Sequence, residues 1–223
     1  MINNNLTVEN LLDLSKSIAS GLFEGLTYPW EALPKISEYI ISIGGSLSED
    51  EYEYRGDGIW IAKTANIMPS AYLAGPLIVC PDAEIRHCAF IRGSAIIGRG
   101  SVIGNSSELK NCIIFDNAQV PHYNYIGDSI LGYKSHLGAG AKTSNLKSDK
   151  TPVTIMADGE KIDTGLKKFG AVVGDNVEVG CNAILNPGTV IGRNTTVYPL
   201  SMVRGYIPGG SIYKKQGEIA EKM

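Results

Sequence analysis

One histidine of the chain stands in a setting suited to proton transfer. His122 follows Pro121 and is followed by two tyrosines, Tyr123 and Tyr125. An imidazole is the side chain best tuned to accept and donate a proton near neutral pH, which suits a general base. A single histidine is otherwise most often a structural residue. The interruption of the sequence pattern around it, described below, favours the functional interpretation.

Two cations, Arg92 and Lys110, form a second candidate site. They lie 18 residues apart, and each directly follows an aliphatic residue of a six-residue repeat, Ile91 or Leu109. If three repeat units complete one turn of the chain, the two cations stack one above the other in adjacent turns. A stacked arginine and lysine can hold a phosphate group through charge-assisted hydrogen bonds. The alternative is a pair of independently solvated surface charges.

The repeat itself is the strongest pattern in the sequence. An aliphatic or aromatic residue recurs at every sixth position from residue 61 to residue 115, and the recurrence resumes after a disturbed stretch. The residues predicted to point inward are Ile61, Ile67, Leu73, Val79, Ile85, Ile91, Ile97, Ile103, Leu109 and Phe115, then Ile126, Leu131 and Leu137, and then Val173, Val179, Leu185, Ile191, Val197 and Val203. Between them, Gly, Asn, Asp and Ser supply residues suited to tight bends.

A six-residue period excludes an α-helix and requires short strands. On a helix, six residues turn the chain through about 600°, so successive apolar side chains would not share a face. In extended chain these residues all point to one side, because six is a multiple of the two-residue strand period. A single strand of this length is far outside the usual range, so the chain must bend within each unit and stack as a parallel β-helix. An ordinary β-sandwich does not account for so long an unbroken phase.

The segments outside the repeat predict two helices and a loop. Residues 7–22 carry Thr7 as a candidate N-cap and apolar residues at helical spacing, and residues 29–43 predict a second helix that starts at Pro29. Both helices are expected to cap an end of the β-helix or to form an appendage beside it. The lysine-rich insert 146–168 is expected to project from one corner. The predicted regions are a helical N-terminal cap over 1–57, a β-helix over 58–205 and a C-terminal tail over 206–223.

Composition narrows the class of protein. The 223 residues, 43% of them hydrophobic, suffice for one buried core. A formal net charge of −3 lacks the basic excess of a nucleic-acid-binding surface. The four cysteines form no CxxC pair, which favours reduced thiols. The chain carries no signal-peptide pattern and no apolar run of ~18 residues. We therefore expect a cytoplasmic protein that binds neither nucleic acid nor membrane.

The disturbed part of the repeat carries motifs of a known family. The segments VPHYNYIGDS, LGAGAKTSN and VVGDNVEVGCNAILNPGTVIG resemble the acetyltransferase domain of the bifunctional glucosamine-1-phosphate acetyltransferases and uridylyltransferases that make UDP-N-acetylglucosamine, including archaeal sugar-1-phosphate relatives. The likeness covers about residues 61–205, and its histidine segment is much more specific than a generic hexapeptide repeat. It implies an all-β fold, a left-handed parallel β-helix with a short α-helical N-terminal region. The handedness rests on the resemblance alone.

The resemblance also implies a role for each matching residue, with His122 as the catalytic base. The substrate-binding residues that it implies are Arg92, Lys110, Tyr125, His136 and Asn145. The residues that it implies for acetyl-CoA binding are Gly138, Ala139, Cys181, Pro199, Lys214 and Lys215. The backbone N–H groups of Gly138 and Ala139 are the implied donors to the thioester oxyanion. The family has an asparagine where this chain has His136, a difference that bears on sugar specificity.

The implied activity is acetyl-CoA-dependent N-acetylation of an amino sugar 1-phosphate, either glucosamine 1-phosphate or galactosamine 1-phosphate. Acetyl-CoA is a co-substrate, no metal is implied, and the partners are these small molecules and two further copies of the chain in a homotrimer. The 57 residues before the repeat are too few for a uridylyltransferase domain. The resemblance therefore predicts an acetyltransferase half without its uridylyltransferase.

Two other functions stay open at this point. A non-catalytic hexapeptide protein could bind a sugar nucleotide or scaffold an assembly, and acetyl-CoA binding distinguishes it from an enzyme. A γ-class carbonic anhydrase uses the same solenoid with three zinc-binding histidines. His87, His122 and His136 are the only histidines, and they lack the paired downstream histidines of that class.

Overall fold

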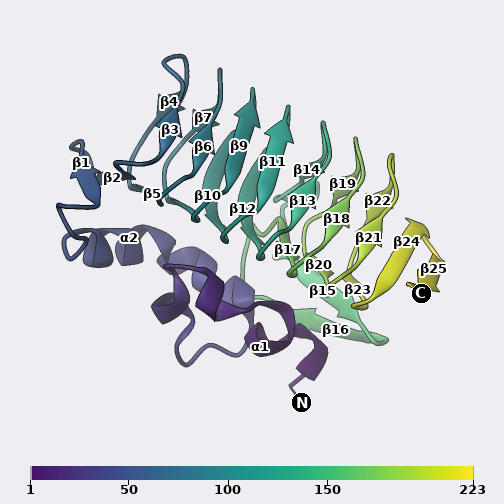
Figure 1. The fold of residues 1–223 in the computed structure, drawn as a ribbon. Coiled ribbons are helices and arrows are strands. Elements are labelled where there is room, and N and C mark those ends of the chain that lie inside the picture. Colours follow the sequence, from purple (N-terminus) through teal and green to yellow (C-terminus); the bar gives the residue numbers. More distant parts are fainter. Residues whose placement is uncertain (1, 223) are drawn as a thin grey trace.

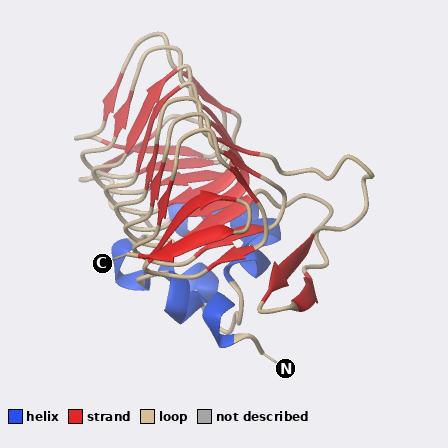
Figure 2. Cartoon of the chain, turned by 90° about the vertical axis from the view of Figure 1, so that its right-hand side faces the viewer, coloured by secondary structure: helices blue, strands red, loops and turns tan. Residues whose placement is uncertain are grey.

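The computed structural model describes residues 2–222 and shows a solenoid of stacked coils (Figure 1). Each coil consists of three short strands joined by tight corners, and Figure 2 shows the coils nearly end on, around a three-sided core. Strands of successive coils pair in parallel, for example β5 with β8 and β9 with β11. The parallel β-helix predicted from the repeat is confirmed.

The strands define three faces of the solenoid. The covered face contains β2 (Ile59–Ala62), β5 (Leu77–Val79), β8 (Ala95–Ile97), the second halves of β10 (Glu108–Ile114) and β12 (Tyr125–Leu131), β17 (Ala171–Val173), β20 (Thr189–Ile191) and β23 (Tyr206–Ile207). The second face contains β3 (Asn66–Ile67), β6 (Glu84–Ile85), β9 (Val102–Asn105), β11 (Gln119–His122), β13 (His136–Leu137), β18 (Glu178–Val179), β21 (Thr196–Val197) and β24 (Ser211–Lys215). The third face contains β4 (Tyr72–Leu73), β7 (Phe90–Ile91), the first halves of β10 and β12, β14 (Lys142–Thr143), β19 (Ile184–Leu185) and β22 (Met202–Val203).

The residues that point into the core of the solenoid, here called the inward row, are as predicted except at one position. The core cluster contains the predicted residues from Val79 to Leu109, and Ile67 and Leu73 at the first coil pack against it while partly buried. Phe115 was predicted to point inward, and this prediction is wrong because Ile114 takes the inward position.

The physical reason is a shortened corner. Leu109 pairs with Ile126, and Ile97 pairs with Ile114, so each step here is one residue shorter than the 18-residue step from Val79 to Ile97.

The shortened corner turns Phe115 outward onto the covered face, where it is fully buried and lies 6.1 Å from Phe23 between ring centroids. From β5 to β20 the outward side chains of the covered face are 0% exposed: Ile78, Ile96, Ile113, Ile130, Val172 and Val190. Fully burying an aliphatic side chain contributes about 1.5–3 kcal/mol, so this face is a second core and not a surface. The N-terminal segment supplies its cover.

The N-terminal helices lie along the covered face and not across an end of the solenoid (Figure 1). The helix predicted over 29–43 is confirmed as two consecutive parts, a 3-10 helix η4 (Pro29–Lys35) and α2 (Ile36–Gly44). The first part contains Pro34, which has no N–H for an α-helical hydrogen bond. Helix α2 contacts β5, β8 and β10, and η4 contacts β12.

The continuous helix predicted over 7–22 is wrong. The segment forms η1 (Asn4–Leu6), α1 (Val8–Leu11), η2 (Leu14–Lys16) and η3 (Ser20–Phe23), and the Thr7 side chain makes no cap hydrogen bond. Asp13 Oδ1 instead accepts hydrogen bonds from the backbone and hydroxyl of Ser15, and Ser17 Oγ accepts one from the backbone of Ala19. Such local side-chain bonds compete with helical ones and hold the chain in short turns.

The insert is a loop followed by an antiparallel hairpin of β15 (Thr154–Ala157) and β16 (Glu160–Asp163), and Figure 2 shows it projecting from one corner. It leaves the stacking intact, because Ile130 pairs with Val172 across it. Two smaller antiparallel pairs lie at the ends of the solenoid, β1 (Tyr52–Tyr54) with β2 and β24 with β25 (Glu218–Glu221).

Candidate functional site

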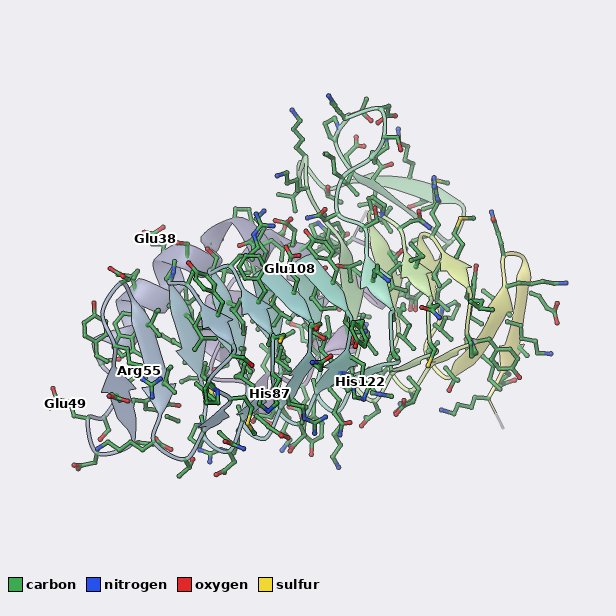
Figure 3. All side chains as sticks on the ribbon, turned by 90° about the horizontal axis from the view of Figure 1, so that it is seen from above. Glu38, Glu49, Arg55, His87, Glu108 and His122 are labelled. Carbon is green, nitrogen blue, oxygen red and sulfur yellow. The ribbon has the colours of Figure 1, made fainter. Side chains whose placement is uncertain are left out.

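One edge of the solenoid collects most of the predicted cofactor residues. At the corner between the second and third faces, the backbone of Gly140 donates to His122 O, that of Asn182 to Ala139 O, and that of Leu200 to Cys181 O. These bonds place His122, Ala139, Cys181 and Pro199 at the same position of successive coils. We call this row the histidine corner. His87 lies at the same edge, and Figure 3 shows the two histidines along it.

His122 is exposed at the end of β11, and its ring forms no hydrogen bond with any group in residues 2–222. Its backbone is fixed by the buried Asn124, whose Oδ1 accepts from His122 N at 3.0 Å. Asn124 Nδ2 donates to Gly138 O at 2.8 Å and to Ala141 O at 3.0 Å, so it joins this coil to the next. Asn124 was not predicted from the sequence. It gives the imidazole a rigid base and leaves the ring free to contact a substrate.

The two implied oxyanion donors differ in availability. Gly138 N donates to Val179 O at 2.7 Å within the ladder between coils, so its prediction as a free donor is wrong. A Cβ at Gly138 would lie 2.7 Å from the backbone nitrogen of Cys181, which explains why a glycine stands there. Ala139 N has no acceptor among residues 2–222 and therefore remains the available donor.

Lys214 and Lys215 continue the histidine corner. They follow Tyr213, which pairs with Val197 as the next coil, so they lie one coil beyond Tyr198 and Pro199. Their ammonium groups lie 3.5 Å and 3.3 Å from carboxylate oxygens of Glu218. Both lysines are exposed, so these ion pairs are weak and screened, and the amines can turn to another anion.

The opposite edge of the third face carries the predicted phosphate ligands. Arg92 and Lys110 occupy equivalent positions of adjacent coils, since Ile91 pairs with Leu109. Each cation contacts a carboxylate that the sequence did not predict. Arg92 Nη1 lies 2.8 Å from Glu108 Oε1, and Lys110 Nζ lies 3.7 Å from Asp128 Oδ2. We call this edge, between the third and covered faces, the cation corner.

Asp128 connects several of the predicted substrate residues. It is only 5% exposed, and its carboxylate accepts hydrogen bonds from Asn111 Nδ2 at 2.9 Å and from Asn145 Nδ2. Asn145 Nδ2 also lies 3.3 Å from Tyr125 Oη. Burial, together with the charges of Asp128 and Glu108, raises the pKa of Tyr125, so its hydroxyl stays neutral. The structure thus brings Lys110, Tyr125 and Asn145 together around one buried carboxylate.

His136 lies apart from this group. It belongs to β13 on the second face, where its Nδ1 lies 2.8 Å from Glu178 Oε2. Tyr125 begins β12 on the third face of the preceding coil. Within one chain, therefore, His136 does not reach the cluster around Asp128.

The histidines do not assemble into a metal site. His87 and His122 share the histidine corner but lie two coils apart, and His136 lies on the second face. In the part of the chain that the structure describes, no group of three His, Cys, Asp or Glu could hold a metal ion. The described helices also include none that is long and apolar enough to cross a membrane.

Comparisons with known proteins give matches over most of the chain. The GMPPB C-terminal domain model matches residues 73–167, and the bacterial transferase hexapeptide model, of six repeats, matches residues 170–205. The bifunctional protein GlmU of Methanococcus vannielii is 33% identical over 207 residues, which cover 91% of this chain and 50% of that protein. The chain thus spans about half the length of such relatives.

A shorter relative matches over more of its own length. The uncharacterized acetyltransferase YaiX of Escherichia coli is 32% identical over 156 residues, which cover 70% of this chain and 68% of YaiX. Among solved structures, the acetyltransferase domain of PglB from Neisseria gonorrhoeae in complex with acetyl coenzyme A is 15% identical, with a TM-score of 0.31, covering 70% of this chain and 54% of that one.

Proposed function

The chain belongs to the hexapeptide-repeat acyltransferases, and on that basis we propose that it transfers the acetyl group of acetyl-CoA to the amino group of an amino sugar 1-phosphate. Glucosamine 1-phosphate is the first candidate acceptor and galactosamine 1-phosphate the second. The motif around His122 and the similarity to GlmU support this class of acceptor.

The observation that carries the proposal is the alignment of the histidine corner. From His122 the row passes Ala139, Cys181 and Pro199 and reaches Lys215, four coils away. With strands about 4.8 Å apart, this edge is about 19 Å long. It offers a general base at one end, a backbone donor beside it, and two lysines at the other end. An extended thioester with a phosphorylated tail fits this order of groups.

The acceptor is proposed to lie on the third face, between the two corners. Arg92 has five N–H donors and uses one on Glu108, and the Lys110 ammonium lies beyond hydrogen-bond distance of Asp128. Both cations therefore retain donors for the phosphate group. Tyr125 lies one coil further along and Asn145 two, and they supply neutral polar groups for the sugar ring.

The proposed reaction needs no group beyond these. His122 removes a proton from the acceptor ammonium, and the free amine attacks the thioester carbonyl carbon. The N–H of Ala139 stabilises the negative charge on the carbonyl oxygen of the tetrahedral intermediate. The C–S bond then breaks, and the leaving thiolate takes the proton held by the His122 imidazolium, while the acylated nitrogen loses its second proton to water. The products are the N-acetylated sugar phosphate, CoA and one proton released to solvent.

We further propose that the protein is a homotrimer. The N-terminal segment occupies the covered face, which leaves the second and third faces for contact between subunits. The third face presents exposed apolar side chains, including Tyr72 at 60%, Phe90 at 41% and Met202 at 51% exposure. A closed ring that packs the second face of one subunit on the third face of the next covers these side chains.

A thiol-release assay with acetyl-CoA and a panel of amino sugars tests the proposal. We expect turnover with glucosamine 1-phosphate or galactosamine 1-phosphate and little with the unphosphorylated sugars, because the cation corner would then have no ligand. Binding of acetyl-CoA without turnover on any amino sugar would contradict the proposal and favour a non-catalytic hexapeptide protein.

A further inference from the structure

The insert forms one wall of a solvent-open cavity of about 400 Å³ that the proposed reaction does not use. It lies between the insert and the cation corner, beyond Asn145 along the solenoid axis. The residues that matter for its chemistry are Leu146, Lys147 and Met156 on the insert side, and Asn186, Pro187 and Arg204 on the solenoid side. Its volume falls within the range of about 300–1,000 Å³ typical of small-molecule sites.

The walls of this insert cavity are firmly held. The insert closes at its base, where Phe169 N donates to Asn145 O at 2.9 Å. Strand β15 packs tightly on the corner: a Cβ at Gly188 would lie 2.8 Å from Val153 Cγ1, and one at Gly205 would lie 2.7 Å from Met156 O. Val153, Ile155 and Ala157 are buried against the covered face. The cavity is therefore a fixed part of the fold.

Arg204 is the exception among the six arginines of the chain. Each of the other five arginines lies within 4.0 Å of a carboxylate: Arg55, Arg86, Arg92, Arg99 and Arg193. Arg204 contacts no carboxylate and makes no side-chain hydrogen bond within residues 2–222, and it lines the cavity. The second cation there, Lys147, is engaged by Thr151 and by Asp149 at 3.5 Å, and the Asp149 carboxylate also lines the cavity. The cavity thus offers one free guanidinium to an anion.

Apolar groups complete the lining. Leu146 and Met156 are 38% and 51% exposed, and Pro187 lines the cavity with them. An inorganic anion would use Arg204 alone and leave these groups in water. A ligand that joins a phosphate to a flat, weakly polar body would contact both kinds of wall.

This position is separate from the proposed acceptor and donor sites. Arg204 belongs to the cation corner, where Ser144 N donates to Leu185 O and Asn186 N donates to Val203 O. It therefore lies four coils beyond Lys110, or about 19 Å at the usual strand spacing. The histidine corner lies on the other side of the third face.

We infer that the insert cavity is a binding site for a nucleoside phosphate, with the phosphate on Arg204 and the base and ribose against Leu146, Met156 and Pro187. The site does not depend on the acetyl transfer proposed above. The guanidinium offers paired N–H donors that match two phosphate oxygens. The insert, which interrupts the six-residue repeat, then has a binding function of its own.

Isothermal titration of the full chain with UDP, ADP and inorganic phosphate tests the inference. We expect saturable binding of at least one nucleotide and much weaker binding of inorganic phosphate. Arg204→Ala should weaken nucleotide binding by about tenfold to a hundredfold, as loss of a charge-assisted contact predicts. Arg55→Ala is the matched control, since Arg55 is exposed at the far end of the solenoid (Figure 3) and should leave the affinity unchanged.

A second variant and a competing ligand test whether the nucleotide binds in the insert cavity. Met156→Ser should weaken nucleotide binding and leave phosphate binding unchanged, because it removes only an apolar wall. Failure of both nucleotides to bind, or equal affinity of Arg204→Ala and wild type, would overturn the inference. Displacement of the nucleotide by CoA would also overturn it, since the nucleotide would then occupy the donor site. Absence of acetyl transfer with nucleotide binding intact would refute the proposed function alone.

Discussion

Replacing Asp128 by asparagine removes one buried charge and leaves the backbone unstrained. Asp128 has φ +47, a left-handed conformation that asparagine also tolerates, so the corner should keep its shape. The substituted side chain retains one acceptor oxygen but presents an NH₂ group in place of the other. It can no longer accept charge-assisted bonds from both Asn111 and Asn145, nor attract Lys110 at 3.7 Å.

The size of the expected change in the KM for the sugar phosphate follows from these contacts. A hydrogen bond to a charged group contributes about 1.5–3 kcal/mol, so loss of the charged acceptor that orients Asn145 should raise the KM for the sugar phosphate by about tenfold to a hundredfold. The KM for acetyl-CoA should change less than about twofold, because the histidine corner is untouched; both constants come from the thiol-release assay. Asp82→Asn is the control, since Asp82 also has a positive φ, +61, and contacts only Arg99 at the surface. An unchanged KM for the sugar phosphate, or equal losses for both substrates, would refute this reasoning.

Three further predictions concern the fold and the assembly. Phe115→Ala should lower the free energy of unfolding by about 3–5 kcal/mol in urea titrations, whereas Ile41→Ala, at an exposed position of α2 outside the proposed subunit contacts, should change it by less than about 1 kcal/mol; the reverse order would contradict the burial of Phe115 under the N-terminal segment. Under native conditions a thiol reagent should label the exposed Cys88 and Cys181 and spare the buried Cys80 and Cys112. Burial raises the pKa of Cys80 to about 12 and also raises that of Cys112. Rapid labelling of all four would indicate a looser core. Light scattering should give the mass of a trimer, and a monomer would contradict the proposed packing of the second face on the third.

The sequence predicts the inward row well because few other arrangements place a large aliphatic residue at every sixth position. It does not locate the shortened corner at Lys110 and Asn111, because Phe115 is apolar and keeps the six-residue phase, whereas the apolar Ile114 stands one residue out of it. The choice depends on which of the two finds a partner outside the core. Phe23, more than 90 residues earlier, provides that partner for Phe115.

The covered face was missed although the sequence carries a signal for it. Strands such as Leu77–Val79 and Ala95–Ile97 are apolar at three consecutive positions, a pattern typical of strands buried on both sides. The six-residue period accounts for only one of the three apolar positions in each strand. The outward apolar residue in each strand indicates a cover, which the N-terminal segment provides.

The candidate site was predicted in part. Positions 17 or 18 residues apart fall on neighbouring coils, so residue spacing places Arg92 and Lys110 together. Spacing does not predict where side chains turn, and for that reason the carboxylates of Glu108 and Asp128 and the buried amide of Asn124 were missed. Nor does it reveal that the N–H of Gly138 is already bonded to Val179 in the next coil.

The central claim is that His122 acts as the general base, and the pH dependence of His122→Ala tests it most directly. Positioned acid–base catalysis contributes about 10²–10⁴-fold, so kcat should fall by that order near neutral pH while the thermal unfolding midpoint and the trimer are retained. Raising the pH should restore part of the lost rate, because more of the substrate amine is already unprotonated. A variant with near-normal kcat, or one whose deficit is the same at every pH, would contradict the assignment of His122.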